Sequence, residues 1–304
     1  MRTRRTIAKE VACEGIALHA GTQVRMLLAP AKPGSGIVFR RMDLDGAEVP
    51  ARYDLVGETL LGTTIEHGRA SVSVIEHLMA AVFGAGIEDL VVELDGPEPP
   101  VLDGDALSFL ELFDVAGAQD TELPLQAVKV VRRVEVAGKD ARAALTPAPE
   151  LQFTFEIQFP SAAIGKQSFA CVFDPEYFRH EIAPARTFGD IAQLEALKQM
   201  DRGHGASLHN TLAIDGDKVL NADIMRFKDE FVRHKILDAI GDLSLAGHYL
   251  IGHVRALRSG HDLNHRLVTA LLARPECWRL TDFSEPVPAP PLAALIPELS
   301  WAEG

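Results

Sequence analysis

The sequence has 304 residues, of which 47% are hydrophobic and 24% are charged. This composition is that of a folded globular protein and excludes a disordered, collagenous or coiled-coil chain, and the length suggests about two domains. The 43 acidic and 30 basic residues give a formal net charge of −13, which repels phosphate backbones, so we expect no nucleic-acid partner.

Cysteine spacing and the length of apolar runs bear on the compartment. Cys13, Cys171 and Cys277 are odd in number and far apart, so they offer neither a disulfide framework nor a zinc knuckle. No uncharged apolar stretch approaches the ~18 residues that a membrane-spanning helix needs. We therefore expect a cytoplasmic protein, and any membrane contact is expected to be peripheral.

The first half of the chain predicts strands followed by helices. Short β-rich segments separated by turn residues open it, and a later apolar stretch free of proline ends at Gly84 and Gly86, as helices commonly do. The expected strands cover 23–29, 36–44, 63–65, 71–74 and 89–94, and the expected helices cover 75–83 and 105–116.

The second half shows the same order after a segment of little periodicity. That segment, 117–127, predicts a linker, so we place the domains at 1–122 and 123–300. The expected strands of the second half cover 128–137, 141–146, 151–159 and 249–257, and the expected helices cover 229–245 and 262–273.

Strands followed by helices within each half predict an α+β fold rather than alternating βαβ units. The second half also has extra material between residues 174 and 227, including an expected short helix over 190–200. In that helix Ile191, Leu194 and Leu197 recur every three residues. Taken alone, this apolar stripe favours a segment sealed onto the protein core.

Two helical motifs contain side chains that could act in catalysis or bind a metal ion. Glu76 and His77 are neighbours at the start of the first expected helix, where the alternative is a surface ion pair. His234, Asp238 and Asp242 recur every four residues, so they share one helix face. A His/Asp pair at this spacing can ligate one Zn²⁺, although a solvated acidic face has the same spacing.

A third motif lies where a strand gives way to the last expected helix. There His261 directly follows Gly260, whose freedom allows a tight turn. If the two halves pack face to face, the three motifs converge. Two histidines and a carboxylate with an open fourth position would then form a catalytic zinc site, with Glu76 and His261 as an acid/base pair.

These motifs, in this order, resemble a known family. The resemblance rests on residues 73–81, 94–104, 185–189, 219–221, 233–243 and 259–264. Together they resemble the UDP-3-O-acyl-N-acetylglucosamine deacetylases, zinc amidohydrolases of lipid A biosynthesis, and the likeness spans about residues 3–280. The run around His234 is the most specific part.

The resemblance implies two β-α-α-β sandwich domains of similar topology whose helical layers face each other, with an active site between them. It implies that His77, His234 and Asp238 bind Zn²⁺. It implies that Glu76 is the general base, that His261 is the general acid or oxyanion partner, and that Asp242 holds His261. Thr187 and Lys235 are implied to be polar groups near the substrate carbonyl. An insertion near 189–220 is implied to border an acyl-chain passage, with these residues in and beside it: Phe188, Ile191, Leu194 and Leu197.

The activity that the resemblance implies is hydrolysis of the N-acetyl amide of UDP-3-O-acyl-N-acetylglucosamine. The products are UDP-3-O-acyl-glucosamine and acetate, and the reaction is the committed step of lipid A biosynthesis in Gram-negative bacteria. The partner is thus a small molecule, and we expect a monomer. One departure from the family is Gly62, where many relatives carry a cysteine.

Two other interpretations of the sequence stay open. One is a metal-dependent hydrolase or dehydratase of the same architecture that acts on another acyl substrate. The other is a non-catalytic module that binds a lipid or a nucleotide sugar. The presence of Glu76 and His261 beside the three candidate ligands argues against the binding module, because a binder needs no general base.

Overall fold

The N-terminal half forms a five-stranded sheet. The computed structural model describes residues 2–283. The strands of this sheet are β2 (Val11–Ile16), β3 (Gln23–Pro30), β4 (Ile37–Arg41), β5 (Ala47–Pro50) and β8 (Leu90–Leu94). Their order is β2-β3-β8-β4-β5, and β4 and β8 run parallel while the other neighbours are antiparallel.

The C-terminal half forms a larger, seven-stranded sheet. Its strands are β10 (Gln126–Val130), β11 (Val134–Ala137), β12 (Arg142–Thr146), β13 (Leu151–Gln158), β14 (Lys166–Val172), β18 (Tyr249–Leu257) and β19 (Trp278–Asp282). The long strand β18 joins the sheet together, because it pairs with β12, β13 and β10. Buried and partly exposed residues alternate along β18, so one face of this sheet is turned to the core.

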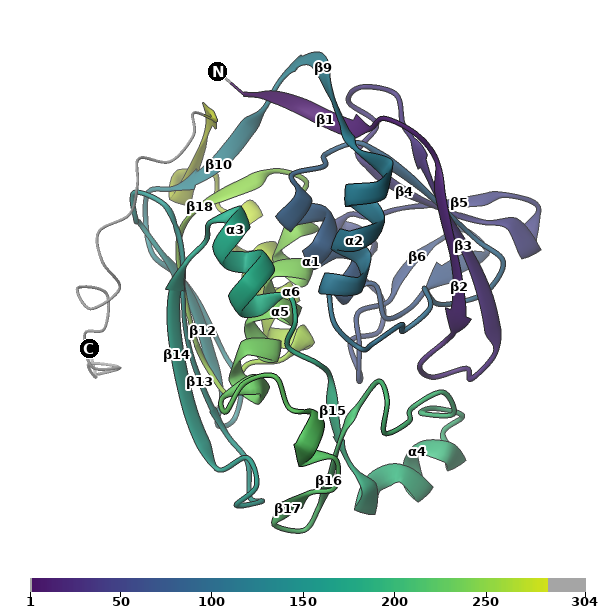
Figure 1. The fold of residues 1–304 in the computed structure, drawn as a ribbon. Coiled ribbons are helices and arrows are strands. Elements are labelled where there is room, and N and C mark those ends of the chain that lie inside the picture. Colours follow the sequence, from purple (N-terminus) through teal and green to yellow (C-terminus); the bar gives the residue numbers. More distant parts are fainter. Residues whose placement is uncertain (1, 284–304) are drawn as a thin grey trace.

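Helices fill the space between the two sheets (Figure 1). The longer ones are α1 (Glu76–Ala85), α2 (Leu107–Ala116), α5 (Glu230–Ser244) and α6 (His261–Leu272). Since α1 is covered from both sides, eight of its ten residues are buried. The predicted α+β fold, with helices of the two halves facing each other, is confirmed. Within residues 2–283, no helix has the length and apolar character needed to cross a membrane.

The helices of the two halves meet where α1 packs against α5. Gly241 of α5 allows a close approach, because a Cβ atom at this position would lie 2.0 Å from the backbone oxygen of Glu76. Any larger residue at this point would push the helices apart. This contact therefore brings the start of α1 beside the middle of α5.

The prediction of a linker over 117–127 is wrong, because most of this segment is a strand. Most of it forms β9 (Ala118–Pro124), which pairs antiparallel with β1 (Thr3–Ile7). The side chains of β9 are mostly exposed and polar, so no apolar alternation marks it as a strand, and its pairing partner is more than a hundred residues away. This strand crosses the expected domain boundary, and residues 284–300 of the expected second domain lie outside the described residues.

Other predicted elements differ in their bounds. The expected strand 128–137 is two strands, β10 and β11, separated by a short turn. The expected strands 63–65 and 71–74 are present, with shifted bounds, as the antiparallel pair β6 (Ile65–His67) and β7 (Ala70–Val72). A short α3 (Pro175–Tyr177) continues into a π-helical turn, Phe178–Ile182.

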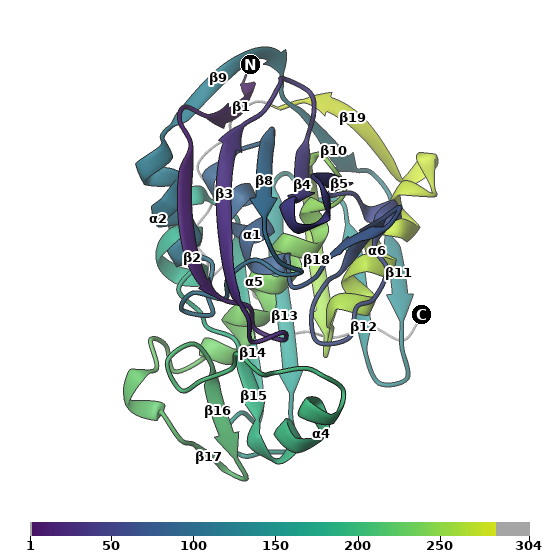
Figure 2. The same ribbon diagram turned by 90° about the vertical axis from the view of Figure 1, so that its right-hand side faces the viewer.

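The insertion of the second half lies at one end of the molecule (Figure 2). It contains α4 (Leu194–Gln199), preceded by a 3₁₀ turn over Ile191–Gln193, in place of the single predicted helix over 190–200. The small sheet beside it has the order β15-β16-β17, with β15 (Phe188–Asp190), β16 (Leu212–Asp215) and β17 (Lys218–Val219).

Candidate metal centre and active site

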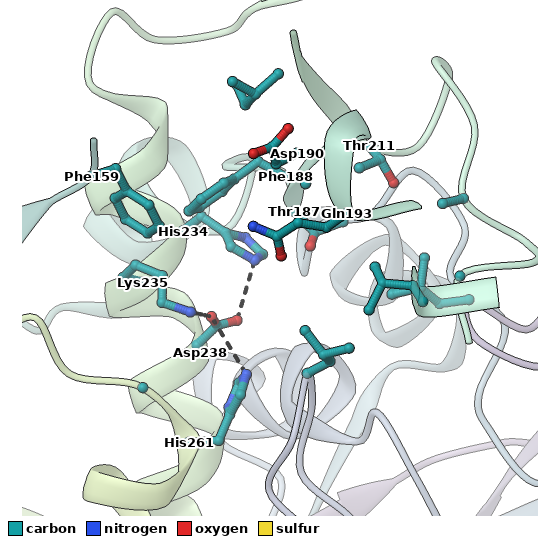
Figure 3. A pocket seen from close by; sticks show the side chains of 18 of the residues that line it. Phe159, Thr187, Phe188, Asp190, Gln193, Thr211, His234, Lys235, Asp238 and His261 are labelled. Carbon is teal, nitrogen blue, oxygen red and sulfur yellow. Dashed lines mark hydrogen bonds and ion pairs between the residues drawn. The ribbon is translucent and has the colours of Figure 1, made fainter. Parts of the chain in front are cut away.

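Three side chains from α1 and α5 converge on one point. The Nε2 atoms of His77 and His234 lie 3.5 and 3.3 Å from Oδ1 of Asp238, and one candidate ligand atom of each residue lies within 4.8 Å of the other two. Figure 3 shows His234 and Asp238 facing each other at the wall of a cavity. The three residues therefore lie together, as the sequence predicts.

The donor set suits a divalent cation. Oδ1 of Asp238 is buried without a hydrogen-bond partner, and a buried carboxylate oxygen rarely lacks one. Two imidazole nitrogens and one carboxylate oxygen are a common catalytic zinc set that leaves a further coordination position open. The residues therefore fit a catalytic metal ion of this kind.

Burial excludes the alternative of a solvated acidic face on α5. His234, Asp238 and Asp242 are 3%, 2% and 1% exposed. Ionised groups are seldom buried unless they are paired or bind metals. One of these charges is balanced by Lys235, whose Nζ donates to Oδ2 of Asp238 at 2.6 Å. Lys235 thus holds the carboxylate oxygen that the two histidines leave free.

The charge states of two of the candidate ligands, His234 and Asp238, are those that metal binding requires. Burial lowers the pKa of His234 to about 3, so this imidazole is neutral at neutral pH. Its Nδ1 lies 3.1 Å from the carbonyl oxygen of Ala185; since a carbonyl can only accept, Nδ1 bears the proton and Nε2 has a free lone pair. Burial acts to raise the pKa of Asp238, but the charged Lys235 and His261 and the hydrogen bond with His77 outweigh it and hold that pKa well below its ordinary value.

Glu76 lies beside this cluster at the first turn of α1. Its side chain is buried, and Oε2 accepts a hydrogen bond from the backbone N–H of Thr63 at 2.9 Å. Burial raises the pKa of Glu76, although nearby His261 and His77 oppose the shift. A Cβ atom at Gly62 would lie 3.1 Å from Oε1 of Glu76, so the glycine leaves room beside this carboxylate.

His261, at the start of α6, faces Glu76 from the other side. Its Nε2 lies 3.8 Å from Oε1 of Glu76, and its Nδ1 lies 2.9 Å from Oδ2 of Asp242. Burial disfavours the charged imidazole, but Asp242 and Glu76 outweigh burial and raise the pKa of His261 to about 9. His261 is therefore protonated at neutral pH.

Two groups that hold Asp242 were missed by the sequence analysis. The Thr63 hydroxyl donates to Oδ1 of Asp242 at 2.5 Å, and the Asn264 amide donates to Oδ2 at 2.8 Å. Asn264 could have been found, because it lies three residues after His261 on the same helix face. Thr63 lies in a loop of the other half, and no local pattern in the sequence points to it.

A cavity of about 910 Å³ opens from this cluster, a volume typical of small-molecule sites. Thr187 and Phe188 line it (Figure 3). The predicted apolar stripe also lines it rather than sealing the insertion onto the core, with Ile191, Leu194 and Leu197 all in the wall. The structure thus brings every predicted site residue to this cavity except Asp242, which lies behind His261.

The chain is similar to known proteins over nearly its whole length. Residues 4–273 match the family model LpxC, described as UDP-3-O-acyl N-acetylglycosamine deacetylase. Curated relatives named UDP-3-O-acyl-N-acetylglucosamine deacetylase include one from Geobacter sp. (strain M21), 44% identical over 99% of both chains. Another, from Myxococcus xanthus (strain DK1622), is 44% identical over 91% of this chain and 88% of its own length. The chain therefore belongs to the UDP-3-O-acyl N-acetylglycosamine deacetylase family.

Proposed function

We propose that this chain is a zinc-dependent amidohydrolase that removes the N-acetyl group of UDP-3-O-acyl-N-acetylglucosamine in lipid A biosynthesis. The single observation that carries the proposal is that His77, His234 and the unpartnered Oδ1 of Asp238 converge beside Glu76 and His261 at one cavity. Family membership supports the choice of substrate, because the relatives named above carry that substrate in their names.

Zn²⁺ held by the two histidines and Asp238 would supply a Lewis acid for the acetyl carbonyl and would make water more acidic. The protein itself provides the proton transfers. In our proposal Glu76 accepts a proton from the attacking water. Its backbone partner, Thr63, holds the carboxylate in place, and the raised pKa of Glu76 makes it a stronger base than an exposed carboxylate.

The charged His261 stabilises the developing negative charge on the acetyl oxygen in this proposal. Asp242 fixes the orientation of the imidazole through Nδ1, so Nε2 points toward Glu76 and the cavity. The departing nitrogen receives its proton from Glu76 or His261, which face the same space. Thr187 and Lys235 add polar groups at the cavity wall near the carbonyl.

Acetate release tests the proposed function. Purified protein loaded with zinc should release one acetate per molecule of UDP-3-O-acyl-N-acetylglucosamine, lose this activity on chelation and regain it with added Zn²⁺. Tight substrate binding without acetate release would favour a binding module instead. Acetate release from other acylated amines, but not from this sugar, would favour a different hydrolase of the same architecture.

The pH dependence of kcat/KM is expected to follow from the titration of two groups, His261 and Glu76. At high pH His261 loses its proton with a pKa of about 9, so kcat/KM is expected to fall above about pH 9; at low pH protonation of Glu76 removes the base. Asp242→Asn should move the basic limb down by about 1–2 pH units, because a neighbouring opposite charge shifts a pKa by this order. Asp229→Asn, directly before α5 and paired with Arg233, is the control. An unmoved basic limb in Asp242→Asn would contradict the role of His261.

We further propose that the apolar wall of the cavity holds the 3-O-acyl chain. Phe188 packs its ring against His234 with centroids 5.9 Å apart, so this wall begins next to the candidate metal ligands. Leu194 and Leu197 of α4 continue it away from the site. An acyl chain in this position would be covered while its sugar stays at the metal centre.

Acyl-chain length should therefore affect turnover strongly. Each buried methylene stabilises by ~0.8 kcal/mol, so removing ten should lower kcat/KM by about 10²–10⁴-fold after allowance for partial burial. Leu194→Asp should weaken this discrimination, whereas Met200→Asp, on the same segment but half exposed outside the cavity wall, should retain it. Equal kcat/KM for long and short chains in the unaltered protein would mean that no acyl passage contributes.

The assembly and location of the protein are part of the same proposal. We propose a cytoplasmic monomer, and the two domains 1–122 and 123–300 stay a prediction because β9 crosses the boundary between them. The support is that both halves of the site lie within one chain, on α1 and on α5, so no second copy is needed to complete it. Light scattering on the eluting protein measures the mass directly, and a dimer mass would contradict the proposal.

A further inference from the structure

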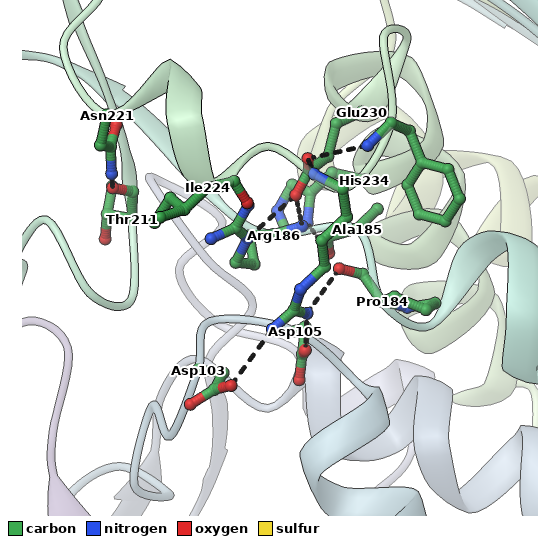
Figure 4. Close-up of polar contacts among 12 residues, drawn as sticks. Asp103, Asp105, Pro184, Ala185, Arg186, Thr211, Asn221, Ile224, Glu230 and His234 are labelled. Atoms are coloured by element: carbon green, nitrogen blue, oxygen red, sulfur yellow. Dashed lines mark hydrogen bonds and ion pairs between the residues drawn. The ribbon is translucent and has the colours of Figure 1, made fainter.

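A buried ion pair lies at the start of α5, one turn before His234. The side chains of Arg186 and Glu230 are 4% and 0% exposed, and Nε of Arg186 donates to Oε1 of Glu230 at 3.0 Å. The same oxygen accepts the backbone N–H of Arg186 at 3.1 Å. The other oxygen accepts the backbone N–H groups of Arg226 at 2.6 Å and Phe227 at 3.3 Å. Four N–H donors therefore fix this carboxylate (Figure 4).

The pair fixes the loop segment 184–187 against neighbouring segments. The guanidinium of Arg186 also donates to the carbonyl of Ile224. The guanidinium of Arg226 donates to the carbonyl of Pro184 at 2.7 Å and binds Asp105 of the N-terminal half. Ala185 therefore lies between Pro184, whose carbonyl is bound by Arg226, and Arg186, whose guanidinium is bound by Glu230 and Ile224.

The neighbouring backbone is held in the same way. The carbonyl of Ala183 accepts the N–H groups of Ala106 and Leu107 at 3.0 and 3.1 Å, and the N–H of Thr187 donates to the carbonyl of Gly104 at 2.8 Å. Each of these contacts joins the segment to the N-terminal half. The position of the Ala185 carbonyl is thus determined by contacts with both halves of the chain.

The Ala185 carbonyl accepts the proton on Nδ1 of His234. Glu230 and His234 are four residues apart, so α5 contacts this segment at two successive turns. We propose that the Arg186–Glu230 pair is a positioning device for His234: it holds the Ala185 carbonyl where it keeps the proton on Nδ1 and turns Nε2 toward Asp238. This inference rests on the ligand role of His234 in the proposed function.

Stability alone is a weak reason for such a pair. Desolvating two charges costs about as much as their attraction returns, and apolar residues of similar volume often do as well. What apolar residues cannot do is gather four N–H donors and set the direction of a backbone carbonyl. Partners that orient a ligating histidine commonly change metal affinity by about 10–100-fold when they are lost.

Glu230→Gln tests the inference. Glutamine has nearly the same volume, but it offers one oxygen where four donors converge, and its NH₂ group must then face an N–H. We expect zinc affinity, measured by chelator competition on metal-free protein, to fall about 10–100-fold. In ¹⁵N spectra of histidine-labelled, metal-free protein, the Nδ1-protonated form of His234 should lose population. Asp229→Asn is the matched control, since its partner Arg233 does not hold segment 184–187.

Unchanged zinc affinity and an unchanged His234 signal in folded Glu230→Gln would overturn the inference, even if thermal stability fell. If this variant does not fold, Arg226→Gln replaces it: Arg226 is 30% exposed, and its loss frees the Pro184 carbonyl while the ion pair stays. Arg226→Gln should weaken zinc binding by a smaller factor, and unchanged affinity would overturn the inference as well. Neither measurement uses substrate, so failure of the proposed deacetylation would appear separately, as absent acetate release in the unaltered protein.

Discussion

Replacing His77 by alanine is expected to leave the purified protein with little bound zinc and almost no turnover. Loss of a group that merely orients a ligand costs about 10–100-fold in metal affinity, so loss of a ligand should cost more than about 10²-fold. His77 is the most informative of the three ligands because it comes from α1, whereas His234 and Asp238 come from α5. Elemental analysis of zinc per chain, with kcat measured on the same sample, checks this result.

A second ligand variant needs more care. Asp238→Ala would leave the ammonium of Lys235, which is 17% exposed, without its partner at 2.6 Å, and breaking a fully buried pair costs up to ~3–5 kcal/mol of folding free energy. Asp238→Asn keeps the volume and is the better choice. His253→Ala is the control, because His253 pairs with Thr154 in the C-terminal sheet and should leave zinc content unchanged. Full zinc in both His77→Ala and Asp238→Asn would disprove the ligand assignment.

Glu76→Gln is expected to separate chemistry from metal binding. Glutamine has nearly the same volume, and its carbonyl can still accept the N–H of Thr63 that now reaches Oε2. It cannot accept a proton from water. We therefore expect zinc to stay bound while kcat falls by about 10²–10⁴-fold, the usual range for lost acid/base assistance.

The matched control for Glu76 is Glu88→Gln. Burial also raises the pKa of Glu88, but its carboxylate accepts the backbone N–H of Arg5 and takes no part in the cavity wall. The Glu88 variant should turn over normally at saturating substrate. Near-normal kcat in Glu76→Gln would show that this carboxylate is not the base, and loss of zinc in Glu76→Gln would show that it contributes to metal binding.

The sequence alone was sufficient to predict the elements that carry the site. The expected strand 249–257 has the bounds of β18, and the expected helix 229–245 differs from α5 by one residue at each end. Both succeed because apolar residues with a clear period face a core that runs the full length of the element. The order of motifs and their resemblance to a family then supplied the residue roles.

Pairing with a distant strand lies beyond such local patterns. The segment 117–127 looked like a linker because β9 is polar and largely exposed. It is a strand because β1, at the other end of the N-terminal half, satisfies its backbone groups. Hydrogen bonding to a strand more than a hundred residues away leaves no period in the local sequence, so the structure was needed to find it.

The environment of the candidate site was likewise decided by tertiary structure. The spacing of His234, Asp238 and Asp242 fits a solvated face and a metal site equally well, because the period of a helix determines which residues share a face but not what covers it. Here α1 covers that face, and the absence of a side chain at Gly241 allows it to come close. Contacts such as the Thr63 hydroxyl on Asp242, or the Ala185 carbonyl on His234, arise between segments 49 to 179 residues apart. Only the packing of the two helical layers brings such groups together, and that packing depends on the whole chain.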